Sequence, residues 1–95
     1  MEVVWTKKAE QDYYDQIDRL LERWNAATAE KFIDLVFKTI DHIVAHLQMY
    51  ALADYQNVRK AVLNKHISLF YRIDKQKIIL LRFWPNRQNP QSLKL

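Results

Sequence analysis

Glycine and cysteine are absent from this sequence of 95 residues, and proline occurs only twice. The absence of cysteine excludes disulfide bonds, thiolate nucleophiles and cysteine-based zinc sites, and it is typical of a reducing compartment such as the cytoplasm. Loops that cradle phosphates need positive φ angles and no side chain near the phosphate, which glycine provides. Nucleotide-binding enzymes with glycine-rich loops are therefore excluded.

Long apolar runs are also absent. No stretch approaches the ~18 residues that cross a bilayer, and no basic segment precedes an apolar one at the N-terminus, so we expect a soluble protein without a signal peptide. The chain is 49% hydrophobic and contains three Trp, five Tyr and four Phe, which predicts one folded domain spanning residues 1–95. With a net charge of only +4, the placement of the basic residues matters more than their number.

Hydrophobic periodicity predicts two helices in the first half of the chain. Apolar residues recur at helical spacing over residues 7–23, behind Thr6 as N-cap, and again for five turns after Trp24. Either Asn25 or Thr28 could cap the second helix, and the short connection predicts an antiparallel helical hairpin. The aromatic residues at helical spacing are predicted to lie in the core: Tyr13, Trp24, Phe32 and Phe37. The lysines at positions 7, 8, 31 and 38 are expected on solvated helix faces.

The second half of the chain reads as strands. A short strand at residues 3–5 precedes the helices, and residues 48–57 read as a loop. Three further strands are predicted at residues 58–63, 66–73 and 77–84, joined by tight hairpins. The order β-α-α-β-β-β predicts an α+β fold, in which the N-terminal helical hairpin packs on one face of an antiparallel sheet.

Alternation along the strands assigns side chains to the two faces of the sheet. Under the helices we expect Ile67, Leu69, Tyr71, Ile73, Ile79, Leu81 and Phe83. On the far face we expect Arg59, His66, Ser68, Phe70, Arg72, Ile78, Leu80, Arg82 and Trp84. A face that combines cations with large apolar groups is typical of a partner site. The alternative is that a loop or the C-terminal tail covers this face.

An arginine follows the last predicted strand in the ending FWPNRQNP. Pro85 and Pro90 restrict the backbone around Arg87, which lowers the entropy lost when its guanidinium is presented to a ligand. The planar guanidinium suits bidentate binding of phosphate. We therefore predict that Arg87 meets an anion in a nucleic acid or on a partner, the alternative being a pair with Asp74 or with backbone carbonyls.

The element order, the helical segment EKFIDLVFKTIDHIVAHL, the strands VRKAVLNKHISLFYRI and the ending IILLRFWPNRQNP resemble the RelE/ParE superfamily of bacterial type II toxins. The resemblance covers nearly the whole chain and implies a cytoplasmic toxin that arrests growth and is neutralised by an antitoxin. RelE-like members cleave mRNA in the ribosomal A site, whereas ParE-like members poison DNA gyrase, and the fold alone does not choose between them. The antitoxin is expected on the apolar part of the far face: Phe70, Ile78, Leu80 and Trp84.

RelE-like nucleases use cations on the basic strand and an arginine after the last strand, which Arg59 and Arg87 match. Ser68 stands where a strand arginine would be, and no Tyr or His follows Arg87, so two usual residues are missing. Cleavage by the 2′-OH needs a base, an acid and cations, and histidine is the residue type that most often acts as general acid or base, so His66 is the candidate on this face. The candidate catalytic set is Arg59, His66 and Arg87. The candidate nucleic-acid-binding set is Arg59, Lys60, Arg72, Arg82 and Arg87.

No cofactor or metal is expected. His42 and His46 are four residues apart on a helix, a spacing that can hold zinc, but no third ligand is evident and a helix surface explains them. Whether the protein is an enzyme, as a ribosome-dependent mRNA endonuclease would be, stays open. The alternatives are a non-enzymatic module that binds nucleic acid or protein, and a degenerate toxin that retains only antitoxin binding.

Overall fold

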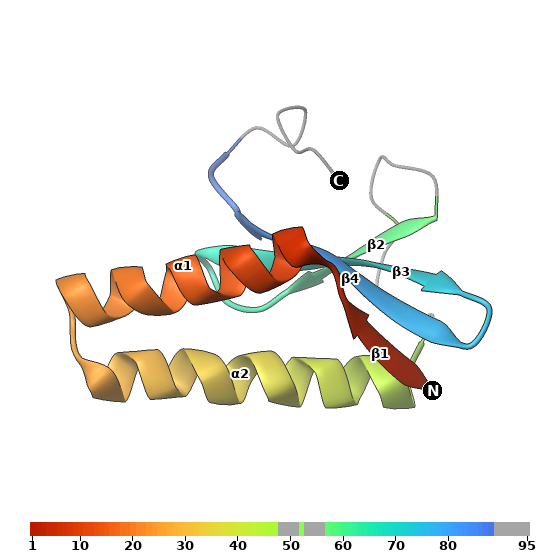
Figure 1. Cartoon of the computed structure of the whole chain (residues 1–95), viewed down its shortest axis with the longest axis horizontal. Coiled ribbons are helices and arrows are strands. Elements are labelled where there is room, and N and C mark those ends of the chain that lie inside the picture. Colours follow the sequence, from red (N-terminus) through yellow and green to blue (C-terminus); the bar gives the residue numbers. More distant parts are fainter. Residues whose placement is uncertain (48–51, 53–56, 89–95) are drawn as a thin grey trace.

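The computed structural model describes residues 1–47, 52 and 57–88. Two long helices lie side by side and antiparallel, next to a four-stranded sheet (Figure 1). The predicted order of elements is confirmed, although most of the predicted loop at 48–57 lies outside the described residues. The elements are β1 (Glu2–Trp5), α1 (Lys7–Arg23), α2 (Ala26–Ala45), β2 (Val58–Val62), β3 (Ile67–Asp74) and β4 (Lys77–Pro85).

Side-chain caps set the start of each helix. The hydroxyl oxygen of Thr6 accepts a hydrogen bond from the backbone N–H of Ala9 at 3.1 Å. The side-chain oxygen of Asn25 accepts one from the backbone N–H of Thr28 at 2.8 Å, so Asn25 is the N-cap of α2. Each cap satisfies an N–H that the helix itself leaves unpaired. Neither helix in the described part of the chain is both long and apolar enough to cross a membrane.

The sheet is mixed rather than purely antiparallel, which corrects the predicted arrangement. Its strand order is β1-β4-β3-β2, in which β2, β3 and β4 form two antiparallel hairpins. The first strand pairs with β4 in parallel, from Glu2 opposite Lys77 to Trp5 opposite Leu80. Only strands joined by tight turns must run antiparallel, and the long connection from β1 to β4 leaves their relative direction free.

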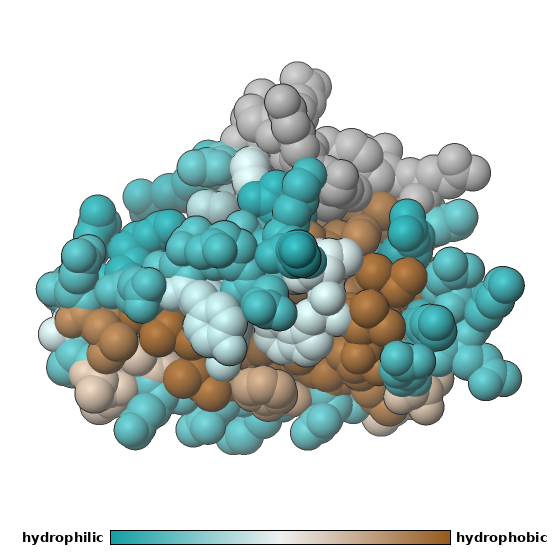
Figure 2. Space-filling view, viewed as in Figure 1, coloured by the Kyte–Doolittle hydropathy of each residue, from teal (hydrophilic) through white to brown (hydrophobic). Residues whose placement is uncertain are grey.

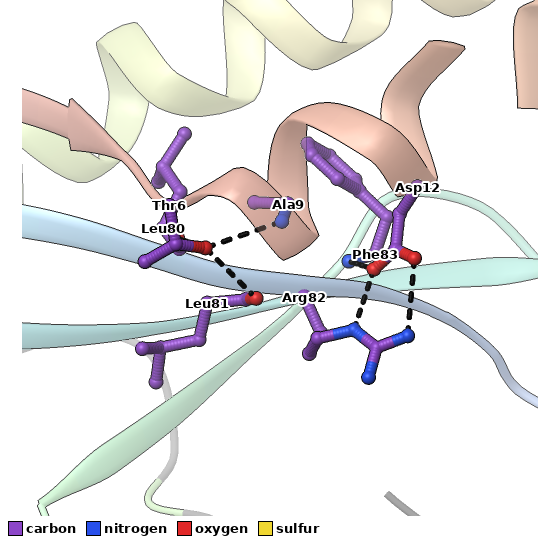
Figure 3. A network of polar contacts seen from close by, with 7 residues as sticks. All are labelled: Thr6, Ala9, Asp12, Leu80, Leu81, Arg82 and Phe83. Carbon is purple, nitrogen blue, oxygen red and sulfur yellow. Dashed lines mark hydrogen bonds and ion pairs between the residues drawn. The ribbon is translucent and has the colours of Figure 1, made fainter. Parts of the chain in front are cut away.

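Helix α1 covers the part of the β4 edge that β1 leaves unpaired. Because β1 ends at Trp5, β4 has a free edge beyond Leu80. Thr6 donates to the Leu80 carbonyl through both its backbone N–H, at 3.2 Å, and its hydroxyl, at 2.8 Å. One turn further along α1, the Asp12 carboxylate accepts from the backbone N–H of Phe83 at 3.1 Å (Figure 3). Such contacts protect the edge from pairing with another chain.

The same carboxylate holds an arginine of β4. Asp12 accepts from Arg82 Nε at 2.7 Å and from Arg82 Nη2 at 3.0 Å, a bidentate ion pair drawn in Figure 3. The two side chains are 17% and 16% exposed, so water screens the pair only in part. Asp12 therefore fixes α1 to β4 through three hydrogen bonds.

A bulge in β4 reverses the predicted faces of half of that strand. Phe70 pairs with Arg82 but Tyr71 pairs with Leu80, so Leu81 is an extra residue opposite the junction. A one-residue shift moves side chains to the other face. The predictions for Ile78, Ile79, Leu80 and Leu81 are therefore wrong, because Ile78 and Leu80 lie in the helix-side core while Ile79 and Leu81 lie on the far face. Phe83 and Trp84 follow the bulge along β4 and lie on the predicted faces.

The main core lies between the helices and the sheet. Its most completely buried side chains come from both layers: Val36, Ile43, Leu69, Tyr71, Ile78 and Leu80. Tyr13 and Phe32 are buried as predicted, but Phe37 is 47% exposed and Trp24 is 71% exposed. Trp24 follows the last turn of α1 as its C-cap. Figure 2 shows hydrophobic residues at the surface between the helices, bordered by hydrophilic side chains.

Tyr13 should make the free energy of unfolding decrease as the pH rises in the alkaline range. Burial, and to a smaller extent the charge of Tyr14, raises the pKa of Tyr13 above 10.0. A raised tyrosine pKa disfavours the ionised form in the folded state, so its contribution is present below about pH 10 and is lost as the pH rises further. Urea unfolding from pH 8 to 11 should show a smaller alkaline loss for Tyr13→Phe than for the parent chain. Tyr14→Phe, at an exposed position, should retain most of that loss.

A lysine occupies a backbone conformation that favours glycine. Lys75, in the two-residue turn between β3 and β4, has a φ of 58°. Among the described residues, the other positive φ belongs to Asn57, a residue type that tolerates it. We expect Lys75→Gly to raise the free energy of unfolding by about 1 kcal/mol, because a left-handed non-glycine residue costs roughly that much. Lys65→Gly, in the other hairpin turn, should lower it slightly, and equal effects in urea unfolding would contradict this prediction.

Candidate functional site

A groove of about 690 Å³ lies where the joined ends of α1 and α2 meet the β2–β3 turn and the end of β4. Figure 1 places the α1–α2 connection at the left, beyond the sheet. The groove has an apolar floor formed by Leu20, Phe32, Leu35 and Ile67. Its walls carry four cations: Arg19, Arg23, Lys31 and Arg87. Of the described residues that line it, none is acidic. We call it the cationic groove.

The four cations are available to a ligand. All four side chains are exposed. Within residues 1–47, 52 and 57–88, the ion pair that joins two described residues is Asp12–Arg82, which lies outside this groove. Exposed cations that line one groove raise the local potential and attract anions. Lys31 was predicted to lie on a solvated helix face, whereas no motif or periodicity in the sequence predicts a role for Arg19 or Arg23.

Arg87 lies in a turn at the end of β4. The turn is closed by a hydrogen bond from the backbone N–H of Gln88 to the carbonyl of Pro85, at 3.1 Å. The alternative partner Asp74 is opposite Lys77, at the other end of the nine-residue strand β4, so it cannot reach Arg87. The position of Arg87 in the cationic groove fits the predicted contact with an anion.

His66 lines the same groove from the β2–β3 turn. The side-chain oxygen of Asn64 accepts from the backbone N–H groups of His66, at 2.8 Å, and Ile67, at 3.1 Å. The carbonyl of His66 in turn accepts from the backbone N–H of Asn86 at 2.9 Å. The fold therefore joins the turn to the segment that carries Arg87, and brings two of the three candidate catalytic residues to one site.

Ser68 supports this arrangement from below the surface. It is fully buried, and its hydroxyl donates to the side-chain oxygen of Asn86 at 2.5 Å. The Asn86 amide also donates to the carbonyl of Asn64 at 2.9 Å. Ser68 thus holds the turn in place, and this position cannot supply the cation that an arginine would provide to a phosphate.

The other predicted nucleic-acid-binding cations do not form one surface. Arg59 is opposite Tyr71 and so lies on the helix side, which corrects its assignment to the far face, because Val58 rather than Arg59 begins the far-face alternation. Lys60 and Arg72 lie on the far face, with Lys60 Nζ 6.0 Å from the Phe70 ring centroid. Arg82 is held by Asp12 and lies 5.0 Å from the Trp84 ring.

The far face of the sheet is not the exposed apolar surface that alternation predicted. Val58 and Phe70 are 3% and 4% exposed, and they cluster with Leu81, Ile79 and Trp84. Ile78 and Leu80, predicted to bind the antitoxin, are fully buried in the helix-side core, so a partner cannot contact their side chains here. Antitoxin binding at Phe70 and Trp84 stays a prediction.

The paired histidines lie at the C-terminal end of α2, with His42 in its last turn and His46 as its C-cap, and neither lines the groove. The rings of His42 and His46 are 4.5 Å apart, between centroids. In the described part of the chain, no third side chain of a metal-ligating type joins them to form a group of three.

The family of the chain follows from a match along almost its full length. Residues 3–90 match the family model described as the ParE toxin of the type II toxin-antitoxin system parDE. This chain belongs to the ParE toxin family. The predicted superfamily and the predicted role as a type II toxin are thereby confirmed, and a ParE toxin implies a cognate antitoxin partner. Among curated proteins, none matches the chain.

Solved structures with the ParE-like fold agree with the fold of this chain. It is similar to a protein of the chromosomal ParDE TA system from P. aeruginosa, with a TM-score of 0.77, 22% identity, and coverage of 90% of this chain and 95% of that one. The YoeB/ParE toxin from Agrobacterium tumefaciens gives a TM-score of 0.65 at 11% identity, with coverage of 90% and 99%. The YoeB dimer from Staphylococcus aureus gives 0.63 at 11%, with coverage of 86% and 92%. At these identities the likeness establishes the fold.

Proposed function

We propose that this ParE toxin arrests growth by acting on DNA gyrase, and that the cationic groove forms part of the surface that engages the target. Membership of the ParE family supports gyrase, because ParE-like members of the superfamily poison it. The observation that carries the proposal is the groove itself, in which four exposed cations line a site without any described carboxylate. Such a site suits anions, and its described lining holds no carboxylate to pair with His66 as acid and base for cleavage.

The test is induction of the chain in a bacterial host that lacks the antitoxin. We expect growth arrest with double-strand DNA breaks and intact mRNA. Arg87→Ala should weaken target binding roughly 10- to 100-fold, because a charge-assisted contact is worth about 1.5–3 kcal/mol. Lys38→Ala removes an exposed cation of α2 outside the groove and should leave the arrest unchanged. Growth arrest without DNA breaks would contradict gyrase as the target.

Ribosome-dependent mRNA cleavage is the second candidate, and the placement of His66 and Arg87 in one groove favours it. In this case purified protein changes mRNA only when ribosomes are present. His66→Ala should then slow cleavage by roughly 10²- to 10⁴-fold, the usual contribution of general acid–base catalysis. If gyrase is the target, the same substitution should leave growth arrest in place.

We also propose that the cognate antitoxin neutralises the toxin by binding it, with Phe70 and Trp84 of the far face as the predicted contacts. Co-expression should restore growth in that case. A protein that binds nucleic acid or antitoxin yet never arrests growth would instead fit the binding-module or degenerate-toxin alternatives.

A further inference from the structure

We propose that the cationic groove takes a single-stranded nucleic acid, with phosphates on its cations and a base stacked on Trp24. The inference rests on the proposed function, since it names what the groove contacts at the target. It assigns a role to exposed cations of α1 and α2 and to Trp24, the C-cap of α1.

Charge is the first argument. Three of the cations come from the helices and Arg87 comes from the turn after β4, so cations from both layers of the fold line the groove. Arg19 and Arg23 are four residues apart, which places them on the same face of α1 with their Cβ atoms about 5–6 Å apart. A row of guanidinium groups at this spacing can contact successive phosphates of one strand.

An exposed tryptophan on the groove wall is the second argument. Trp24 is 71% exposed, the largest exposure among the large hydrophobic side chains of the described residues. Its backbone is fixed, because the N–H of Trp24 donates to the carbonyl of Leu20 at 2.9 Å and closes the last turn of α1. An aromatic side chain held in water beside cations is the usual stacking platform for an unpaired base.

The shape of the groove favours a single strand over a duplex. Stacking on Trp24 requires a base whose flat face is accessible, and in a duplex these faces are stacked on each other. The apolar floor formed by Leu20, Phe32 and Leu35 suits the face of a second base. An acidic protein segment would use the cations but has no need of an exposed tryptophan, so the tryptophan distinguishes the two occupants.

The test is binding of the purified full chain to a fluorescently labelled 12-nucleotide oligonucleotide, followed by anisotropy at 50 and 200 mM salt. We expect affinity to fall steeply with salt, and Arg19→Ala, Arg23→Ala and Lys31→Ala each to reduce the salt slope by about one. Trp24→Leu should weaken binding roughly 5- to 150-fold, whereas Trp24→Phe keeps an aromatic face and should retain most of the affinity. Lys38→Ala is the matched control outside the groove.

Deoxythymidine and uridine oligonucleotides distinguish DNA from RNA as the source of the strand, and binding of either one supports the inference. Duplex DNA bound as tightly as a single strand would overturn it, as would affinity that does not depend on Trp24. Preferential binding of a 12-residue glutamate peptide would overturn it in favour of a protein partner.

If oligonucleotides fail to bind while DNA breaks persist in cells, this inference fails and the proposed function stands. If they bind and no breaks form, the gyrase proposal fails alone.

Discussion

Asp12→Ala should lower the free energy of unfolding by about 2–4 kcal/mol, the largest effect expected of any single polar side chain described here. The substitution removes the carboxylate that accepts from the Arg82 guanidinium and from the Phe83 N–H. Removing the carboxylate from a largely buried ion pair is costly, and hydrogen bonds to charged groups are worth more than neutral ones. Urea unfolding of the purified variant measures the loss.

Two further variants separate this pair from a general effect of charge. Asp18→Ala, on the exposed surface of the same helix, should change stability by less than about 0.5 kcal/mol. Arg82→Met removes the guanidinium, so the double variant with Asp12→Ala should lose less than the sum of the single losses. Strict additivity would show that the ion pair does not stabilise the fold.

Leu80→Ala should cost about 3 kcal/mol, whereas Ile79→Ala should cost about 1–2 kcal/mol. Leu80 is fully buried between the sheet and the helices, and its truncation leaves a cavity. Ile79 is only partly buried, in the smaller far-face cluster. The order of the two losses in urea unfolding tests the bulge directly, because uninterrupted alternation from Phe83 predicts the reverse order.

Leu69 on β3 provides the control for this comparison. Its side chain lies on the helix face, where regular alternation and the observed register agree. Leu69→Ala should therefore cost as much as Leu80→Ala. Equal losses at Ile79 and Leu80 would contradict the register shift between Phe70 and Tyr71.

Local signals were sufficient for the helices and for the order of the elements. Thr6 and Asn25 each have a side-chain oxygen placed to accept from an N–H three residues further on, and both helices begin directly after these residues. Such caps depend on neighbours within one turn and can therefore be read from the sequence. The family resemblance also came from contiguous stretches of sequence, which run from the second helix to the turn after the last strand.

Trp24 and Phe37 illustrate where periodicity stops being informative. A helical pattern shows which residues share a stripe, but it does not show how far the sheet extends beneath that stripe. Trp24 lies past the last turn of α1 and Phe37 lies one position beyond the buried Val36, so both are exposed. The cationic groove depends on the same fact, because its walls come from four segments that only the tertiary structure brings together.

The sequence by itself determined the start of α1, the element order, the α+β class and the membership of a toxin superfamily, because these depend on local caps, periodicity and contiguous motifs. Only the tertiary structure decided the parallel pairing of β1 with β4, the faces of Ile78 and Leu80, and the meeting of Arg87 with Arg19, Arg23 and Lys31. Strand pairing and bulges are set by the packing of distant segments against one core. Alternation along a strand does not reveal a bulge, in which two residues of that strand lie opposite one residue of its neighbour.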